Sequence, residues 1–350
     1  MAKERKPAEM RRVQLTGGST LIVSLPKDWV NEVKIKRGDL LKISPQPDGS
    51  LSVVPQSVAG ASAATSEASF DVLPGSDPDD AVRQFIARYL AGYKLIKIHF
   101  EQQAARYKNH VKEVIRRKLI GVEIVEEFGN ELTAQCLLYS TELPVKKALA
   151  RMSIITSSMQ KDAIQALKEV DKSFASEIVL RDDEIDRFYF FIVRQLKMAV
   201  NNRSLLEEME LKRPTDCLGY RLVVKSVERV ADHAVRVASV IGEMDKPLPP
   251  NVYSKVLQLS KISNELYEGS MLALEKLDTD LAQKIIAKTP NAQKMEDDIL
   301  SEALGSHKGA KAVMEIEVIA HALKRIAEYG SDIAEMAINL SIENQMTAKK

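Results

Sequence analysis

The chain has 350 residues, a formal net charge of +1 and 45% hydrophobic residues. This length is enough for two or three domains with proper hydrophobic cores. The near-zero net charge excludes a global attraction to nucleic acid or membrane, so any such role must come from a local patch. No apolar run reaches the ~18 residues that a membrane-spanning helix needs, and we expect no membrane insertion.

The cysteine and aromatic content indicate the cellular compartment and the main type of secondary structure. The two cysteines, Cys136 and Cys217, are too few for a disulfide framework or a zinc-binding pattern. With no secretory leader, they predict a reduced, cytoplasmic protein. Aromatic residues make up only 5% of the chain, while Ala, Leu, Lys, Glu and Ile abound, which favours helix.

Residues 1–58 predict a small β domain. Short strands are expected at 11–16, 20–25, 40–44 and 50–55. Gly17-Gly18 turns the chain between the first two strands, and Pro26 begins a short helix. Four short strands in ~45 residues bury too little apolar surface to be stable alone. We therefore expect a homodimer formed through residues 11–55.

The order of these features resembles the AbrB/MazE-type swapped-hairpin domain. A strand, a glycine turn, a strand ending in Pro26-Lys27, a short helix, Gly38-Asp39 and a final hairpin follow one another. The resemblance implies interleaved hairpins and a basic face that binds DNA. Many DNA-binding members carry Arg directly after the first turn, where this chain has Ser19. A domain that only dimerises is the alternative.

A modest basic excess supports the DNA-binding interpretation. Residues 1–58 hold ten Lys and Arg against six Asp and Glu, a net of +4. Basic side chains on a local surface can hold DNA phosphates. The candidates are Arg11, Arg12, Lys27, Lys34, Lys36 and Arg37.

Residues 59–141 divide into a predicted linker and a small α/β subdomain. The linker, 59–77, is rich in Ala, Ser, Gly, Pro and Asp and lacks periodicity. In 78–141 we expect a helix over 79–91 capped by Asp79 or Asp80, a strand over 94–100, a helix over 102–119, and strands over 121–126 and 132–139. The second helix is basic, and we interpret Arg106, Lys108, Lys112, Arg116, Arg117 and Lys118 as a solvated face rather than a binding surface.

The remaining residues predict two three-helix bundles, over 142–246 and 247–350. Expected helices span 144–171, 173–202 and 217–244, then 252–277, 280–306 and 311–340. The third helix of each set carries a related segment, SVERVADHAVRVA at 226–238 and ALKRIAEYGSDIA at 322–334. The simplest fold consistent with these elements is mainly α, with tandem three-helix bundles preceded by a small swapped-hairpin β domain and a small α/β subdomain.

Two carboxylate pairs lie at helical spacing in the first bundle. Glu228 and Asp232 are four residues apart beside an apolar stripe, and Asp182 and Asp186 repeat this spacing in the preceding helix. Like charges so placed destabilise a helix, and a hard divalent cation would reverse that effect. The alternative is neutralisation by ion pairs. Its candidate cations are Arg187, Arg229 and Arg236.

The segment ERVADHAVRVA is preceded by the helix RDDEIDRFYFFIVRQL and followed by a second bundle. In this arrangement the chain resembles the PhoU family of phosphate-signalling proteins over roughly residues 142–345. Members are tandem three-helix bundles whose Glu/Asp-x-x-x-Asp motifs bind metal clusters on the bundle surface. The resemblance implies a divalent or transition metal ion (Mg, Mn, Fe or Zn) as cofactor. Its ligands would be Asp182, Asp186, Glu228 and Asp232.

The second repeat departs from this pattern. Lys324 aligns with Glu228, and Glu328 aligns with Asp232. A shifted pair, Glu328 and Asp332, follows one turn later, so the second site is either displaced or lost. His233 adjoins Asp232 but points about 100° away on a helix, which predicts a packed or exposed side chain rather than a ligand.

The two resemblances together imply a phosphate-responsive regulator of phosphate uptake that acts on transcription through its N-terminal domain. The alternative is an adaptor that binds no DNA and inhibits the phosphate ABC transporter by contacting its ATPase. Metal-dependent hydrolysis at the four carboxylates is a third hypothesis. No Ser/His/Asp or Cys/His arrangement indicates catalysis, so we expect no enzyme.

Overall fold

The computed structural model describes residues 9–45, 49–55, 67–137, 143–200, 202–305 and 309–348. The chain divides into two compact units, Met1–Ser66 and Glu67–Lys350. In the ranges that the structure describes, no helix is long and apolar enough to cross a membrane.

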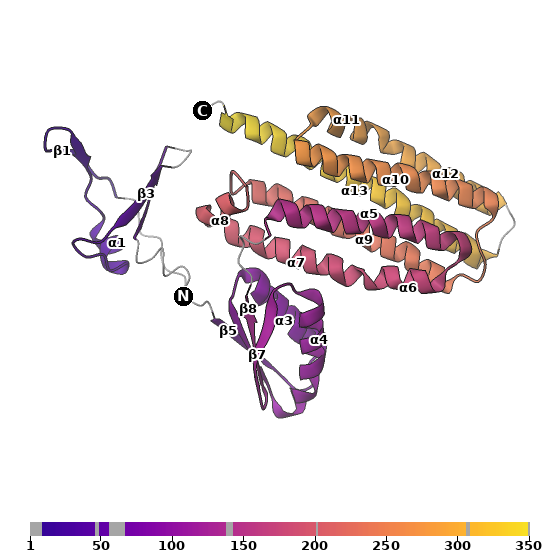
Figure 1. Ribbon diagram of the computed structural model, residues 1–350, viewed down its shortest axis with the longest axis horizontal. Helices are drawn as coiled ribbons and strands as arrows, with labels where there is room; N and C mark the ends of the chain where they lie inside the picture. Colours follow the sequence, from indigo (N-terminus) through magenta and orange to yellow (C-terminus); the bar gives the residue numbers. More distant parts are fainter. Residues whose placement is uncertain are drawn as a thin grey trace. The chain divides into compact units, whose positions relative to one another are not determined.

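The first unit consists of two antiparallel hairpins and a short helix (Figure 1). Its elements are β1 (Gln14–Thr16), β2 (Thr20–Ile22), α1 (Lys27–Glu32), β3 (Leu41–Pro45) and β4 (Leu51–Pro55). β1 pairs with β2, and β3 pairs with β4. Gly17 and Gly18 make the first turn with φ of 60° and 87°, values that favour glycine. The predicted order of strands and helix is thus confirmed.

The described residues of this unit, in a single copy, form no hydrophobic core of their own. Of its described residues only Pro55 is buried. Leu15 and Leu21, cross-strand partners in β1 and β2, are 65% and 68% exposed. Apolar side chains left in solvent at this density mark an interaction surface, as expected for a domain that is completed by a partner.

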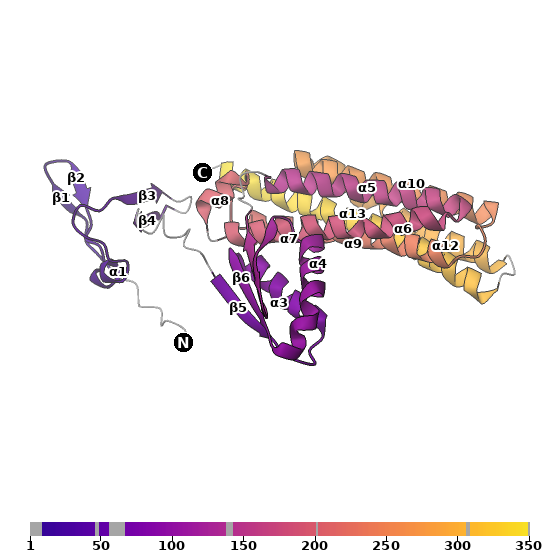
Figure 2. The same ribbon diagram turned by 60° about the horizontal axis from the view of Figure 1, so that its bottom comes forward.

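The second unit begins with a four-stranded sheet covered by two helices. The elements are β5 (Glu67–Val72), α3 (Pro78–Ala91), β6 (Leu95–Phe100), a 3₁₀ helix (Gln102–Tyr107), α4 (Lys108–Lys118), β7 (Val122–Phe128) and β8 (Glu131–Cys136). The sheet order is β5-β6-β8-β7, with β5 parallel to β6 and the other pairs antiparallel. α3 and α4 lie on one face of the sheet (Figures 1 and 2). A core of residues such as Phe85, Tyr89 and Ile96 fills the space between.

The predicted linker, 59–77, is corrected in its second half, where β5 forms the edge of this sheet. Ala68, Phe70 and Val72 alternate toward the core with more exposed neighbours, a two-residue period that the surrounding Ser, Gly and Asp obscured. The cap of α3 is also corrected. Its N-cap is Asp77, whose carboxylate accepts a hydrogen bond from the backbone N–H of Asp79 at 3.0 Å.

Two helical bundles follow and share one continuous core. The first contains α5 (Val145–Glu169), α6 (Lys172–Leu180), α7 (Asp182–Ala199), a short α8 (Arg203–Glu208) and α9 (Asp216–Glu243). The second contains α10 (Pro250–Lys276), α11 (Thr279–Lys288), α12 (Pro290–Gly305) and α13 (Ala310–Ala348). The long helices run side by side (Figures 1 and 2). The tandem bundles are confirmed, except that each predicted middle helix is broken, at Arg181 and at Thr289.

Matching caps reveal how the two bundles correspond. Val170 and Leu277 end α5 and α10 in the left-handed conformation. The next residues, Asp171 and Asp278, cap α6 and α11 through their carboxylates. Both steps are 107 residues (170 to 277 and 171 to 278), whereas the related segments of the third helices lie 96 residues apart, so the two bundles correspond in their connections as well but differ in length between them.

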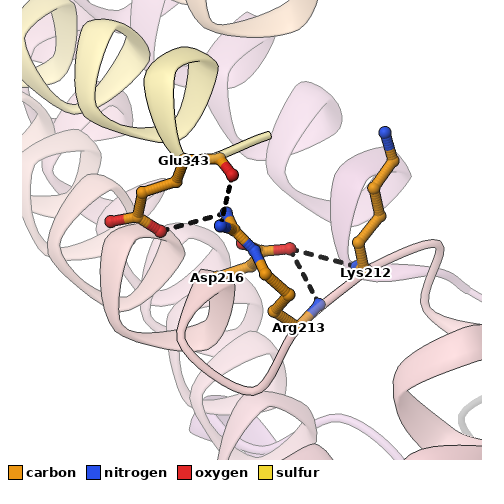
Figure 3. Close-up of polar contacts among 4 residues, drawn as sticks. All are labelled: Lys212, Arg213, Asp216 and Glu343. Atoms are coloured by element: carbon orange, nitrogen blue, oxygen red, sulfur yellow. Dashed lines mark hydrogen bonds and ion pairs between the residues drawn. The ribbon is translucent and has the colours of Figure 1, made fainter. Parts of the chain in front are cut away.

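A buried polar clamp joins the start of α9 to the end of α13 (Figure 3). Asp216 is 4% exposed and accepts hydrogen bonds from the backbone N–H groups of Lys212 and Arg213, each at 3.0 Å. The Arg213 guanidinium binds the Asp216 carboxylate at 2.6 Å and the carbonyl oxygen of Glu343 at 2.6 Å. Asp216 is therefore fully satisfied in its buried position.

Candidate functional site

The predicted carboxylate pairs of the first bundle lie on two helices that pack together, α7 and α9. In α9 a stripe that includes Val224, Val227 and Ala231 is completely buried. Glu228 and Asp232 follow these residues around the helix, at the margin of the core.

The four carboxylates share one electrostatic environment. Burial, followed by the negative charges of Asp186, Asp232 and Glu228, raises the pKa of Asp182 to about 6. Burial also raises the pKa of Asp232, with Glu228 as the next cause. The fold therefore brings both predicted pairs within electrostatic reach of one another. Among the described residues, Asp182 forms no ion pair.

Three cations neutralise the other members of this carboxylate cluster, which comprises Asp182, Asp186, Glu228 and Asp232. Lys118 Nζ lies 2.7 Å from Asp186 Oδ2. Lys225 Nζ lies 2.5 Å from Glu228 Oε2, and Arg229 Nη1 lies 3.2 Å from Asp232 Oδ2. Of the arginines predicted to neutralise the cluster, Arg229 does so, whereas Arg187 and Arg236 form no ion pair with any described residue. Two lysines act in their place.

The carboxylate cluster fits a hard cation in its chemistry but not in its present arrangement. Carboxylate oxygens are the ligands that hard divalent cations prefer. Asp182 is half-buried, and Asp186 and Asp232 each raise its pKa more than Lys118 lowers it, an imbalance that a bound cation would correct. Yet nowhere in the described ranges do three Asp, Glu, His or Cys side chains converge closely enough to hold a metal ion. A metal would first have to displace the ammonium groups that hold these carboxylates.

The second bundle replaces this arrangement with a buried ion pair. Lys324, at the position of Glu228, places Nζ 2.9 Å from Oε2 of Glu296 on α12. Glu296 is 5% exposed and also contacts Gln293 Nε2 at 3.0 Å and His321 Nδ1 at 3.1 Å. The protein thus supplies its own cation at this place.

The predicted pair Glu328 and Asp332 forms no comparable centre. Glu328 is bound by Arg325 and lies 4.0 Å from Lys324. Burial raises the pKa of Asp332, followed by Glu335 and Glu328 on its own helix. No carboxylate of α12 contributes to that shift. The residues of the second bundle therefore do not fit a metal site.

His233 is packed, as predicted, against Tyr329 with ring centroids 5.8 Å apart. Burial, followed by the charges of Arg325 and His321, lowers the pKa of His233 to about 4. It borders a cavity of about 420 Å³ between α9 and α13 that also exposes Arg236 and Glu317. His233 is therefore neutral near pH 7.

The six DNA-binding candidates of the first unit are all exposed. Arg11 pairs with Glu9, and the remaining five extend from the start of β1 to the turn after α1. The backbone N–H of Lys36 binds the Asp39 carboxylate at 2.7 Å, which shapes that turn.

Sequence reasoning missed Lys118 and Lys225 as members of these sites, and it placed Lys324 at the position of Glu228 without pairing it with Glu296. The pairing of Lys225 with Glu228 follows from a three-residue helical spacing. The solvated-face interpretation of α4 was wrong for Lys118, because it contacts α7, 68 residues further on. No local pattern reports a contact of that kind.

Comparison with known proteins identifies the family. The PhoU domain model matches residues 149–241 and 256–337, together half of the chain. A model described as antidote-toxin recognition MazE, bacterial antitoxin, matches residues 14–59. The phosphate-specific transport system accessory protein PhoU homolog of Aquifex aeolicus is 25% identical over 203 residues, which cover 56% of this chain and 89% of that protein.

Two further comparisons agree. The homolog of the same name from Clostridium acetobutylicum is 19% identical over 202 residues, covering 57% of this chain and 91% of that protein. The crystal structure of PhoU from Pseudomonas aeruginosa has the same fold over 57% of this chain and 96% of its own, with a TM-score of 0.51 and 20% identity. The chain therefore belongs to the PhoU family and carries a MazE/AbrB-like domain at residues 14–59.

Proposed function

We propose that this protein is a cytoplasmic, phosphate-responsive regulator of phosphate transport. The observation that carries the proposal is the match of the PhoU domain model to both helical bundles. The relatives that match the same region bear the name of accessory proteins of the phosphate-specific transport system. No catalytic role is proposed.

The first bundle would bind a divalent or transition metal ion. The carboxylate cluster on α7 and α9 supports this role, because burial and the like charges of Asp186 and Asp232 disfavour the charged form of Asp182. When bound, the ion would neutralise the cluster and stabilise the packing of α7 against α9. We propose no metal site in the second bundle, because Lys324 already neutralises Glu296 there.

Titration calorimetry with Mg²⁺, Mn²⁺, Fe²⁺ and Zn²⁺ tests the metal site. Asp182→Asn and Asp232→Asn should abolish binding or weaken it by more than about tenfold, because each removes a charged ligand. Asp298→Asn is the matched control, since this exposed carboxylate lies on α12 outside the cluster. Equal affinity in all three variants would place the metal elsewhere.

The N-terminal unit would dimerise the protein and bind operator DNA. The MazE-type match, the exposed Leu15 and Leu21, and the six exposed basic residues support this role. Binding of phosphate-transporter promoter DNA should weaken linearly with log salt, with a slope of about −0.9 per phosphate contact on duplex DNA. Replacing Arg11 and Arg12 by Ala should reduce that slope, whereas Lys42→Ala on β3 serves as control. Binding without a salt slope would remove the DNA role.

A protein-interaction adaptor is the second candidate function. The lengths of the relatives favour this role. The matched region is 56–57% of this chain but about nine-tenths of each relative. Residues 67–350 form a compact unit and should then retain a transporter-ATPase partner in a pull-down. Loss of the partner on removal of residues 1–66 would count against an adaptor role for the bundles alone.

A further inference from the structure

We propose that the cavity between α9 and α13 binds a phosphate group, with Arg229 and Arg236 as cationic donors and Glu317 as the acceptor for a hydroxyl group of the ligand. The phosphate group would come from free orthophosphate or from a nucleoside monophosphate. The binding site is argued from the cavity itself, whereas its use as the sensor of phosphate rests on the proposed function.

The cavity has a volume of about 420 Å³ and is lined by one face of each of the two helices. The α9 residues in its wall lie three, four and seven positions after Arg229, so they share a face. Polar side chains of both helices line it, among them Arg229, Asp232, His233, Arg236, Glu317 and His321. Cavities of this size hold small molecules, and orthophosphate would occupy only part of the space.

Positive charge predominates around the half-buried ring of His233 in the cavity wall. Burial, followed by four positive charges, lowers the pKa of His233. These charges belong to Arg325, His321, Arg229 and Arg236. The carboxylate of Asp232 is held by Arg229, whose Nη1 lies 3.2 Å from Asp232 Oδ2. Such a concentration of cations in a hollow favours a bound anion.

The donors of the cavity suit a phosphate group in their chemistry. The planar guanidinium of arginine has five N–H donors whose geometry matches phosphate oxygens. Arg236 is exposed and forms no ion pair within the ranges that the structure describes. Arg229 donates to Asp232 from Nη1, which leaves its other terminal nitrogen for a ligand. His321 contacts Glu296 through Nδ1 at 3.1 Å, so Nε2 is the ring nitrogen that remains.

The internal repeat separates Arg236 from the packing of the helices. The aligned segments of α9 and α13 place Arg325 at the position of Arg229, and both arginines pair with a carboxylate three residues later. By contrast, the residue 96 positions after Arg236 is Asp332. The second repeat therefore folds with a carboxylate at this place, and Arg236 adds a cation that the helix packing does not require.

Glu317 gives the cavity a means to select phosphate over sulfate. This glutamate is exposed in the cavity wall, and it forms no ion pair with any residue that the structure describes. An ionised carboxylate only accepts hydrogen bonds. Orthophosphate near neutral pH keeps at least one O–H group that can donate to Glu317, whereas sulfate has none and would be repelled.

The test is titration calorimetry of the full-length protein with orthophosphate, AMP and sulfate at constant low ionic strength. The protein is first treated with a chelator and transferred to metal-free buffer, so that phosphate carried by a metal ion is not counted. Arg236→Gln should weaken phosphate binding by about tenfold or more, because a charge-assisted contact is lost. Arg203→Gln is the matched control, since it removes the same charge from an exposed arginine of α8 outside the cavity.

A second variant tests the selectivity. The wild type should bind orthophosphate at least about tenfold more tightly than sulfate, and Glu317→Gln should narrow this difference, because the repelling carboxylate becomes a neutral amide. Both Arg236 and Glu317 are exposed, so neither substitution disturbs the core.

The outcomes separate this site from the proposed function. Binding of orthophosphate, AMP or both supports the site and identifies the source of the phosphate group. A wild type that binds neither ligand overturns the site and leaves the proposed regulator in place, because that function rests on the family match. Unchanged affinity in Arg236→Gln puts the anion elsewhere and also overturns the site. Equal affinity of the wild type for phosphate and sulfate overturns the role of Glu317.

Discussion

The Nζ atom of Lys324 lies 2.9 Å from Oε2 of Glu296, in a bundle whose repeat partner has Glu228 in place of the lysine. Both side chains are largely buried, at 13% and 7% exposed. Lys324→Met would leave the Glu296 carboxylate buried without its main counter-ion. We expect a loss of about 3 kcal/mol in the free energy of unfolding, measured by urea denaturation.

The control for this prediction is an ion pair on the surface. Lys255→Met removes a pair with Glu302 whose side chains are 39% and 32% exposed, and it should cost below about 1 kcal/mol. The double variant Lys324→Met, Glu296→Met should recover most of the lost stability, since two apolar groups replace a buried pair. Equal costs for Lys324→Met and Lys255→Met would show that the Lys324 pair is not desolvated.

Asp182 makes the metal-free protein sensitive to pH. Its folded pKa, about 6, lies above its ordinary value of 3.8, so the folded state holds this proton more tightly than the unfolded state. Stability should therefore fall as pH rises from about 4 to above 6. Asp182→Asn should be more stable than wild type at pH 7.5 by about 1 kcal/mol, after allowance for solvent screening, and equal to it near pH 3.5.

Thermal unfolding, measured across this pH range in the presence of a chelator, checks the direction in which stability changes with pH. Addition of a cation that binds the carboxylate cluster should reverse the order, because it stabilises only the charged form. A variant that is less stable than wild type at pH 7.5 without metal would contradict the assigned environment of Asp182.

Periodicity and capping chemistry made the helical part of the fold predictable. The apolar stripe through Val224, Val227 and Ala231 gave the orientation of α9 correctly, and Glu228 and Asp232 lie where that stripe places them. β5 was missed because a six-residue strand in a Ser- and Gly-rich context carries too few apolar positions. Compositional bias outweighed the short alternation there.

The counter-cations of the candidate site were not predictable in the same way. Lys225 is local to Glu228, but Lys118 reaches Asp186 only because the α/β subdomain docks on α7. Docking depends on Arg194, whose partners are backbone carbonyls. Backbone acceptors leave no signature in the amino-acid pattern, so the contact could be read only from the fold.

Arg194→Met should loosen the α/β subdomain. It removes the guanidinium donor from three carbonyl groups at the end of α3, and we expect a loss of about 2–4 kcal/mol in the unfolding free energy. Arg203→Met is the control, because its pair with Glu207 is exposed and should contribute about 0.5 kcal/mol or less. Hydrogen exchange of residues 78–93 should accelerate in Arg194→Met alone; uniform acceleration over the bundles would indicate global unfolding instead.

The exposure of Leu15 and Leu21 predicts that the first unit needs a partner chain to cover its apolar surface. They face each other across β1 and β2 and are both largely exposed in one copy. Leu21→Glu should convert the expected dimer of the full-length protein to a monomer, as measured by light scattering, because a charge replaces apolar surface that the partner would cover. Thr16→Glu, on the other face of the hairpin, should leave the dimer intact. A monomeric wild type would contradict the expected dimer.

Gly330 allows a close approach between the backbones of α13 and α10. A Cβ atom at this position would lie 3.2 Å from both the carbonyl carbon of Leu266 and the backbone nitrogen of Tyr267, and backbone atoms cannot rotate away. Gly330→Ala should therefore cost about 1–3 kcal/mol despite the higher helix propensity of alanine. Gly242→Ala, in α9 with nothing within 4 Å of the new methyl group, should instead be neutral or stabilise by up to about 1 kcal/mol. Denaturation of both variants checks the opposite signs, and a stable Gly330→Ala would mean that α10 and α13 can move apart without loss of packing.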